Sequence, residues 1–205
     1  EALGAARLNG AQMEAIRAIA VMKSVGVHVA SDALALGNMA GTGEGASAVA
    51  VFGDDTWSEG TQVPADSRFM AKHLYMPVME PSTFQEVKDW IRIAFELSEK
   101  ARLYVAYLIT SNQADGGGTV QMHPNQFPEI SLNNPVRLDP TTISPDERVI
   151  IPPHTAIKEK EVLEQRFPLL LNLAKEYNLN RILYGPESGT KRIGFVTSSL
   201  AYCYL

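Results

Sequence analysis

The chain has 205 residues, of which 45% are hydrophobic, and its 18 basic and 23 acidic side chains give a formal net charge of -5. This is the composition of a globular protein, and the length allows one large domain or a compact domain with part of another. Without a cluster of Lys and Arg, the chain lacks the electrostatic pattern of a nucleic-acid binder, and no apolar run approaches the roughly 20 residues that a membrane-spanning helix needs. Nucleic-acid binding and membrane-spanning classes are therefore excluded.

Cys203 is the only cysteine. One thiol cannot form an internal disulfide, a multi-cysteine zinc site or, without other chains, the ligand set of an iron–sulfur cluster. We therefore expect a reducing, cytoplasmic setting. Because the chain starts at Glu1 inside a predicted helix and stops at Leu205 inside a predicted strand, we also expect a fragment of a longer protein.

Apolar periodicity predicts alternating helices and strands over the first 110 residues. We expect helices at 1–16, 27–40 and 66–73 and one that starts at Ser82, with strands at 18–22, 46–52, 76–81 and 103–109 and a turn at 23–26. Ser82 and Gln85 have the spacing of a capping box. The three longer strands are apolar throughout, which is typical of strands covered on both faces. The order predicts an α/β domain with a mostly parallel sheet and helices on both faces.

The pattern changes after Asn112, where a triple glycine and then scattered prolines occur without sustained periodicity. This composition predicts an extended linker over 113–190. Within the linker, 158–177 is predicted to be an exposed helix with one apolar side. Residues 191–205 are predicted to begin a second α/β domain, with a strand at 193–198.

Two features near the second long strand invite a ligand-binding interpretation. The glycines at 41, 43 and 45 precede this strand with G-x-G-x-G spacing, which favours a helix-to-strand turn over a dinucleotide-binding loop. Asp54 and Asp55 follow the strand, at the edge where α/β proteins bind ligands. They could hold Mg²⁺ or could cap the next turn. The four histidines have no metal-binding spacing, and His28 stands out only because it lies in a helix that follows a strand.

Three segments resemble one enzyme family. Residues 21–32 (VMKSVGVHVASD) resemble the MK-x-VG-x-x-VA-x-D stretch of indolepyruvate ferredoxin oxidoreductases, which are thiamine diphosphate-dependent 2-oxoacid:ferredoxin oxidoreductases. Residues 54–86 resemble the family's DD…SSQ…D-x-R…P-x-x-EPS…QE run, and 193–202 resemble its GIITSG-x-AY strand. The similarity covers residues 1 to about 110 and 180 to 205 and implies that 1–112 is the pyrimidine-binding domain, N-terminally truncated.

The resemblance also implies roles for individual residues. It places Glu1 on the family's glutamate that pairs with N1′ of the aminopyrimidine. A carboxylate there favours the imino tautomer, whose exocyclic nitrogen removes the thiazolium C2 proton. The loop after the first strand and the loop after the second are implied to contact the cofactor, through Lys23, Ser24, Val25, Gly26 and Asp55. Substrate contacts are implied for His28, Gln62 and Arg68, and a metal site within the chain is not expected.

The implied activity is oxidative decarboxylation of a 2-oxoacid with coenzyme A and reduction of ferredoxin. Residues 56–62 (TWSEGTQ) replace the family's PGMHSSQ loop, which leaves the 2-oxoacid open, with an arylpyruvate such as indolepyruvate as the first expectation. Thiamine diphosphate with Mg²⁺ would be shared with a diphosphate-binding domain or subunit, and iron–sulfur clusters would lie in partner domains of an oligomer. The alternatives are a non-oxidative thiamine diphosphate-dependent decarboxylase and a catalytically silent structural subunit.

Overall fold

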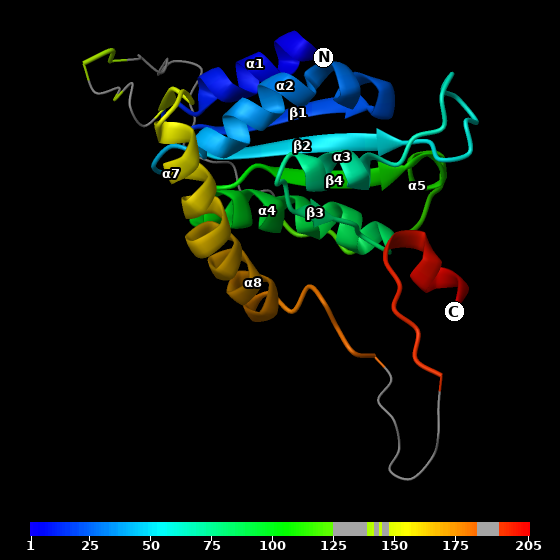
Figure 1. The fold of residues 1–205 in the computed structure, drawn as a ribbon. Coiled ribbons are helices and arrows are strands. Elements are labelled where there is room, and N and C mark those ends of the chain that lie inside the picture. Colours follow the sequence, from blue (N-terminus) through cyan, green and yellow to red (C-terminus); the bar gives the residue numbers. More distant parts are fainter. Residues whose placement is uncertain (125–138, 142–143, 145–147, 184–192) are drawn as a thin grey trace.

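The computed structural model describes residues 1–124, 139–141, 144, 148–183 and 193–205. Helices and strands alternate through the first 115 residues (Figure 1), in the order α1 (Ala2–Ala11), β1 (Arg17–Lys23), α2 (Ser24–Ala40), β2 (Ser47–Asp54), α3 (Ser67–His73), β3 (Val78–Met79), α4 (Phe84–Ala101), β4 (Val105–Thr110) and α5 (Ser111–Asp115). The later elements are α7 (His154–Glu161), a π-helical turn (Val162–Arg166), α8 (Phe167–Glu176) and a 3-10 helix (Ser199–Tyr204). In these ranges, no helix is both long and apolar enough to cross a bilayer.

The four strands form one parallel sheet in the order β1-β2-β4-β3. This confirms the predicted α/β class with a parallel sheet. The register pairs Lys23 with Gly53 and Asp54 with Thr110, so the carboxyl ends of β1, β2 and β4 lie at the same edge. The arrowheads in Figure 1 mark this edge.

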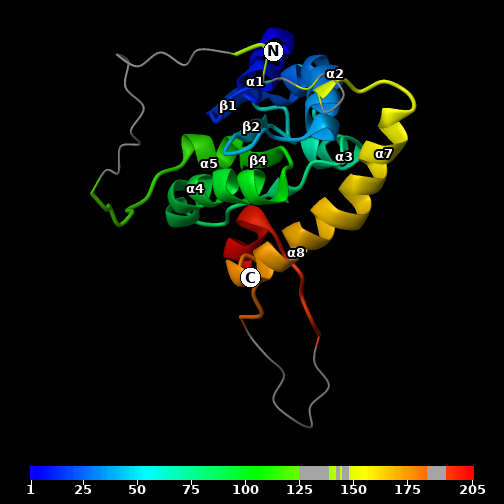
Figure 2. The same ribbon diagram turned by 90° about the vertical axis from the view of Figure 1, so that its left-hand side faces the viewer.

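Helices cover both faces of the central strands, as predicted (Figure 2). Alternate residues of β2 explain this arrangement, because successive side chains of a strand point to opposite faces. Ala48, Ala50 and Phe52 belong to a buried cluster with residues of α1 and α2. Val49 packs in a second cluster with α4 and α8, on the other face.

Strand β1 differs from the prediction, which had it covered on both faces. It is an edge strand, and Ile19 and Val21 are 49% and 73% exposed, whereas Ala20 and Met22 are buried. The buried pair faces the cluster of α1 and α2, and the exposed pair points to the side where α4 packs on β2 and β4. Apolar content alone therefore did not distinguish an edge strand from a central one.

Three predicted boundaries were wrong. Helix α1 ends at Ala11, where the buried Gln12 amide donates to Leu8 O (3.2 Å) and Ser47 O (3.3 Å) and ties the end of the helix to β2. Helix α2 begins at Ser24, directly after β1, so of the turn predicted at 23–26 Lys23 ends the strand and residues 24–26 are helical. At α4 the N-cap is Thr83, whose hydroxyl accepts from Glu86 N at 3.2 Å, in place of the predicted capping box one residue earlier.

The C-terminal third corrects two further predictions. The helix expected at 158–177 begins earlier, at His154, and contains the π-helical turn. Its predicted apolar side is buried, with Val162, Leu170 and Leu173 packed on the α4 side of the sheet, while most of its other positions are exposed. Residues 193–198 form no strand, because within the described part of the chain they pair with none. Much of the predicted linker, at 125–138, 142–143, 145–147 and 184–190, lies outside the described residues, as do residues 191–192.

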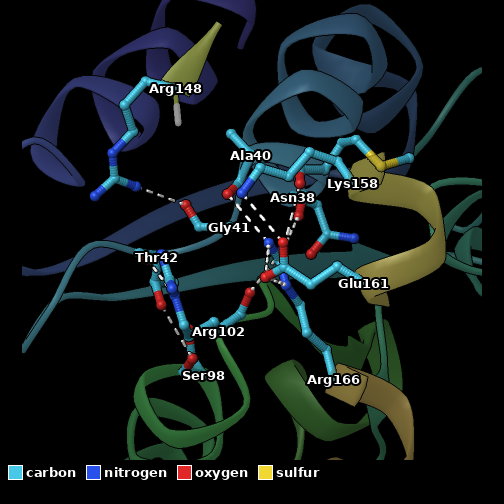
Figure 3. A network of polar contacts seen from close by, with 11 residues as sticks. Asn38, Ala40, Gly41, Thr42, Ser98, Arg102, Arg148, Lys158, Glu161 and Arg166 are labelled. Carbon is cyan, nitrogen blue, oxygen red and sulfur yellow. Dashed lines mark hydrogen bonds and ion pairs between the residues drawn. The ribbon is translucent and has the colours of Figure 1, made fainter. Parts of the chain in front are cut away.

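A buried arginine joins the later helices to the sheet domain. Arg166, in the π-helical turn, is 3% exposed and forms an ion pair with Glu161 (Nη2 to Oε1, 2.7 Å). Its guanidinium also donates to four backbone carbonyls at 3.2 to 3.4 Å, those of Asn38, Met39, Ala40 and Arg102 (Figure 3). Since the last carbonyls of a helix have no partner within it, Arg166 supplies the cap for α2.

We predict that Arg166→Met lowers the free energy of unfolding by about 3 kcal/mol, because it leaves a half-buried carboxylate and several carbonyls without their donor. Urea unfolding measures this change. Lys160→Met is the control, since Lys160 is 71% exposed and its ion pair with Glu164 spans 3.8 Å; its effect is expected within about 0.5 kcal/mol. Equal stability of the two variants would contradict the role of Arg166.

Acid should reduce this difference. Burial alone would raise the pKa of Glu161, but the hydrogen bonds from Arg166 and Lys158 hold it below its ordinary value of 4.5. A carboxyl whose pKa is lowered by folding stabilises the fold above its unfolded-state pKa, and this contribution is lost as the pH falls through the folded-state pKa. The difference in unfolding free energy between wild type and Arg166→Met should therefore become smaller as the pH falls below 4.5 and be fully restored at pH 7, whereas the part due to the backbone carbonyls should persist in acid.

Candidate functional site

The candidate site lies at the carboxyl edge of the sheet, where open parallel α/β sheets bind ligands. Three connections start there. Helix α2 follows β1 at Lys23 without a loop, residues 55–66 follow β2 as an irregular segment, and α5 follows β4 at Thr110. The site residues predicted from the sequence all belong to the first two connections or to the start of α1 or α3.

Glu1 lies against the first turn of α2. Its backbone carbonyl accepts from Ala5 N at 3.0 Å, which fixes it at the start of α1. Its side chain crosses Gly26, and a Cβ built on residue 26 would lie 3.0 Å from both Cδ and Oε1 of Glu1. The structure therefore brings together Glu1 and the segment 23–26, which the sequence analysis had placed at the same cofactor.

The first turn of α2 contains an unsatisfied polar group. The hydroxyl of Ser24 is fully buried and has no hydrogen-bond partner in the part of the chain that the structure describes. Lys23, the N-cap residue, offers no side-chain cap, and its side chain is exposed. A buried hydroxyl without a partner costs free energy, so this turn is a place where a bound polar group would be stabilising. His28 lies one turn further along α2 and is exposed.

Asp55 organises the loop after β2. Its carboxylate accepts from the backbone amides of Glu59, Gly60 and Thr61 at 2.7 to 2.9 Å. The hydrogen bonds from Gly60 and Glu59 lower the pKa of Asp55. This geometry matches the turn-capping alternative for Asp55, and its role as a cofactor ligand stays a prediction.

Asp54 is also held by its own chain. It is 2% exposed and accepts from the amide of Ser67 at 2.9 Å and from the hydroxyl of Ser67. Burial raises the pKa of Asp54, although the Ser67 hydrogen bonds oppose this effect. No group of three or more His, Cys, Asp or Glu that could hold a metal ion occurs in residues 1–124 or in the later described ranges.

A cleft of about 340 Å³ opens beside these carboxylates, between the ends of β2 and β4 and the C-terminal 3-10 helix. Arg68 lines it and pairs with Asp66 (2.8 Å) and Glu80 (3.5 Å). The hydrogen bond to Asp66 raises the pKa of Arg68, so the guanidinium stays charged. Gln62 is exposed on the loop and does not line this cleft.

Sequence reasoning missed several residues of this cleft. Thr110, Ser111 and Asn112 line it, and the rule that drew attention to Asp54, a polar residue directly after an apolar strand, applies equally to Thr110. Glu80 and Ser198 also line it, and their side chains are joined by a hydrogen bond of 3.0 Å. This contact spans 118 residues of sequence, so no local pattern could reveal it.

The chain was compared with known proteins. No family model matches, and no solved structure matches significantly. Curated relatives match over almost the whole chain: indolepyruvate oxidoreductase subunit IorA of Archaeoglobus fulgidus is 30% identical over 195 residues, which are 95% of this chain and 29% of the relative. The subunits of the same name from Pyrococcus abyssi and Methanothermobacter thermautotrophicus are 29% and 32% identical, each over 93% of this chain and 28% or 29% of the relative.

The chain is therefore similar to IorA subunits over almost its whole length. This confirms the resemblance found in residues 21–32 and 54–86. The chain spans less than a third of the length of these IorA subunits.

We predict that Asp55→Ala loosens this loop without unfolding the sheet, because three backbone amides lose the carboxylate that accepts their hydrogen bonds. Amide hydrogen exchange at 56–63 should become faster, while β2 and β4 keep their protection. Glu59→Ala is the control, since only the backbone amide of Glu59 bonds to Asp55. Unchanged exchange in the loop of Asp55→Ala would show that the loop is ordered by other contacts.

Proposed function

We propose that this chain forms the pyrimidine-binding half of a thiamine diphosphate site in an indolepyruvate oxidoreductase-type complex. The observation that carries the proposal is the Glu1 side chain lying on Gly26, at the carboxyl end of β1. The names of the relatives support an oxidoreductase subunit that acts on indolepyruvate. The cofactor, coenzyme A, the ferredoxin acceptor and the partner chains belong to the proposal.

The described residues fit the pyrimidine end of the cofactor. When bound, thiamine diphosphate would supply a thiazolium ring that takes up the electron pair released on decarboxylation. A carboxylate at the position of Glu1 would hold a proton at N1′ of the aminopyrimidine, which is acid–base work for a single side chain. The unsatisfied hydroxyl of Ser24 would offer a hydrogen bond at the same turn.

The described residues do not fit the diphosphate end. That end needs Mg²⁺ held by oxygen ligands, and Asp54 and Asp55 are already engaged by Ser67 and by the amides of 59–61. Cys203 is the only cysteine and cannot hold a cluster by itself. The diphosphate-binding surface and the iron–sulfur clusters therefore belong to partner domains in this proposal.

The substrate is proposed from the relatives' names and from the cleft. An arylpyruvate has a carboxylate that the charged Arg68 could bind. The exposed Trp57, also at the cleft, offers an aromatic surface for an indole or phenyl ring. His28 and Gln62 remain predicted substrate contacts from the sequence.

The test is a purified complex that contains this chain. It should contain thiamine and iron, and it should reduce viologen or ferredoxin when given indolepyruvate and coenzyme A. Release of a free aldehyde without reduction of the acceptor would indicate the non-oxidative decarboxylase instead. Absence of thiamine together with no turnover would indicate a silent structural subunit.

We predict that Glu1→Gln lowers turnover by about 10² to 10⁴-fold in this complex, since an amide hydrogen-bonds but does not hold the proton as a carboxylate does. Steady-state viologen reduction measures the loss, and circular dichroism checks that the fold is intact. Glu44→Gln is the matched control, because Glu44 is exposed and precedes β2, at the opposite edge of the sheet. Wild-type turnover in Glu1→Gln would remove Glu1 from the mechanism.

A further inference from the structure

We propose that Gly26 is a positioning residue: the absence of a side chain there makes room for Glu1 and holds its carboxylate over the first turn of α2. The inference rests on the proposed function and goes beyond it, because it assigns to Gly26 a steric role toward Glu1 in place of a contact with the cofactor. Gly26 is buried, and its backbone lies in the regular helix α2.

The atoms nearest to the place of a Cβ at residue 26 belong to one side chain. A Cβ at this position would overlap Cγ of Glu1 and would lie 3.0 Å from Cδ and Oε1, and these three Glu1 atoms are its nearest neighbours. The backbone of Glu1 is fixed by the hydrogen bond from Ala5 N, at 3.0 Å. An added methyl group would therefore force the Glu1 side chain to rotate away from α2 while α1 stays in place.

A second glycine of α2 separates this role from ordinary helix packing. Gly37 lies 11 residues, or about three helical turns, after Gly26, so both are on the face of α2 that meets α1. A Cβ at Gly37 would lie 2.7 Å from Oη of Tyr104 and 2.8 Å from Cγ of Asn9, two groups that are hydrogen-bonded to each other (3.0 Å). Gly37 therefore allows close packing of α2 on buried, hydrogen-bonded neighbours, whereas Gly26 faces one exposed side chain.

The two glycines should respond differently to alanine. Gly26→Ala should keep or raise the melting temperature of the complex, because alanine favours helix over glycine and the exposed Glu1 can swing out. Gly37→Ala should lower the melting temperature, because its neighbours are held in the core. A purely structural role for Gly26 would make both variants less stable.

The functional readout is exchange of the C2 proton of bound thiamine diphosphate with deuterium from solvent, followed by NMR in the intact complex without substrate. We expect Gly26→Ala to slow this exchange by about 10²-fold, the scale of a misplaced catalytic group. Gly37→Ala should leave it unchanged below its melting temperature. A crystal structure of the Gly26→Ala complex should show the Glu1 carboxylate displaced from α2.

Removing Glu1 tests whether Gly26 acts through it. We expect Glu1→Ala to slow the exchange of the C2 proton. In the Glu1→Ala background, Gly26→Ala should slow this exchange further by less than about twofold, because the effects of coupled positions are not additive. An additive loss in the double variant, wild-type exchange in Gly26→Ala, or an unmoved Glu1 in its crystal structure would each overturn the inference. A wild-type complex that does not accelerate exchange would instead overturn the proposed function and, with it, this role of Gly26.

Discussion

Parallel pairing of β1, β2 and β4 is the constraint on which the rest of the molecule depends. Parallel strands need a crossover between them, so a helix must return the chain from each carboxyl end to the amino edge. In this chain the crossovers place α2 and α3 on one face, beside α1, and α4 on the other, and both faces of β2 become buried. The same pairing gathers Lys23, Asp54 and Thr110 at one edge, although 87 residues of sequence separate the first from the last.

Helix α2 connects the two edges of this sheet. Its first turn lies under Glu1 at the carboxyl edge, and its last carbonyls accept from Arg166 at the other end. Contacts that hold the later helices in place are thus separated by the length of the helix from the candidate site. We infer that substitutions at Arg166 act on stability, whereas substitutions around Gly26 act on the geometry of Glu1.

Much of the sheet could be predicted from the sequence, because runs that are apolar throughout, such as 46–52 and 103–109, are typical of buried strands. The family resemblance also predicted that Glu1 and the segment 23–26 contact the same cofactor. In the structure the side chain of Glu1 lies against Gly26 of this segment. Other features depend on contacts distant in sequence. The exposure of Ile19 and Val21 follows from the place of β1 at the sheet edge, which its apolar composition did not reveal.

The helix boundaries and polar networks were harder to predict for the same reason. Gly26 suggested a turn, but helix α2 continues through it. The lack of a side chain at Gly26 instead leaves room for the side chain of Glu1, the N-cap residue of α1. Arg166 lies four residues after Val162 and four before Leu170, so it is on the same buried face of the helix as these apolar residues. This spacing indicated that Arg166 is buried, although the side chain is charged. Its four backbone acceptors lie 64 to 128 residues away.

The loop that Asp55 organises also carries an optical reporter. Trp57 is 82% exposed at the carboxyl edge, whereas the other tryptophan, Trp90, is partly buried in α4. Indole emission moves to shorter wavelength when water is removed from the ring, so any surface that covers this edge would change the spectrum of one tryptophan and leave the other as an internal reference. The arrival of a partner domain could therefore be followed by intrinsic fluorescence, without a label.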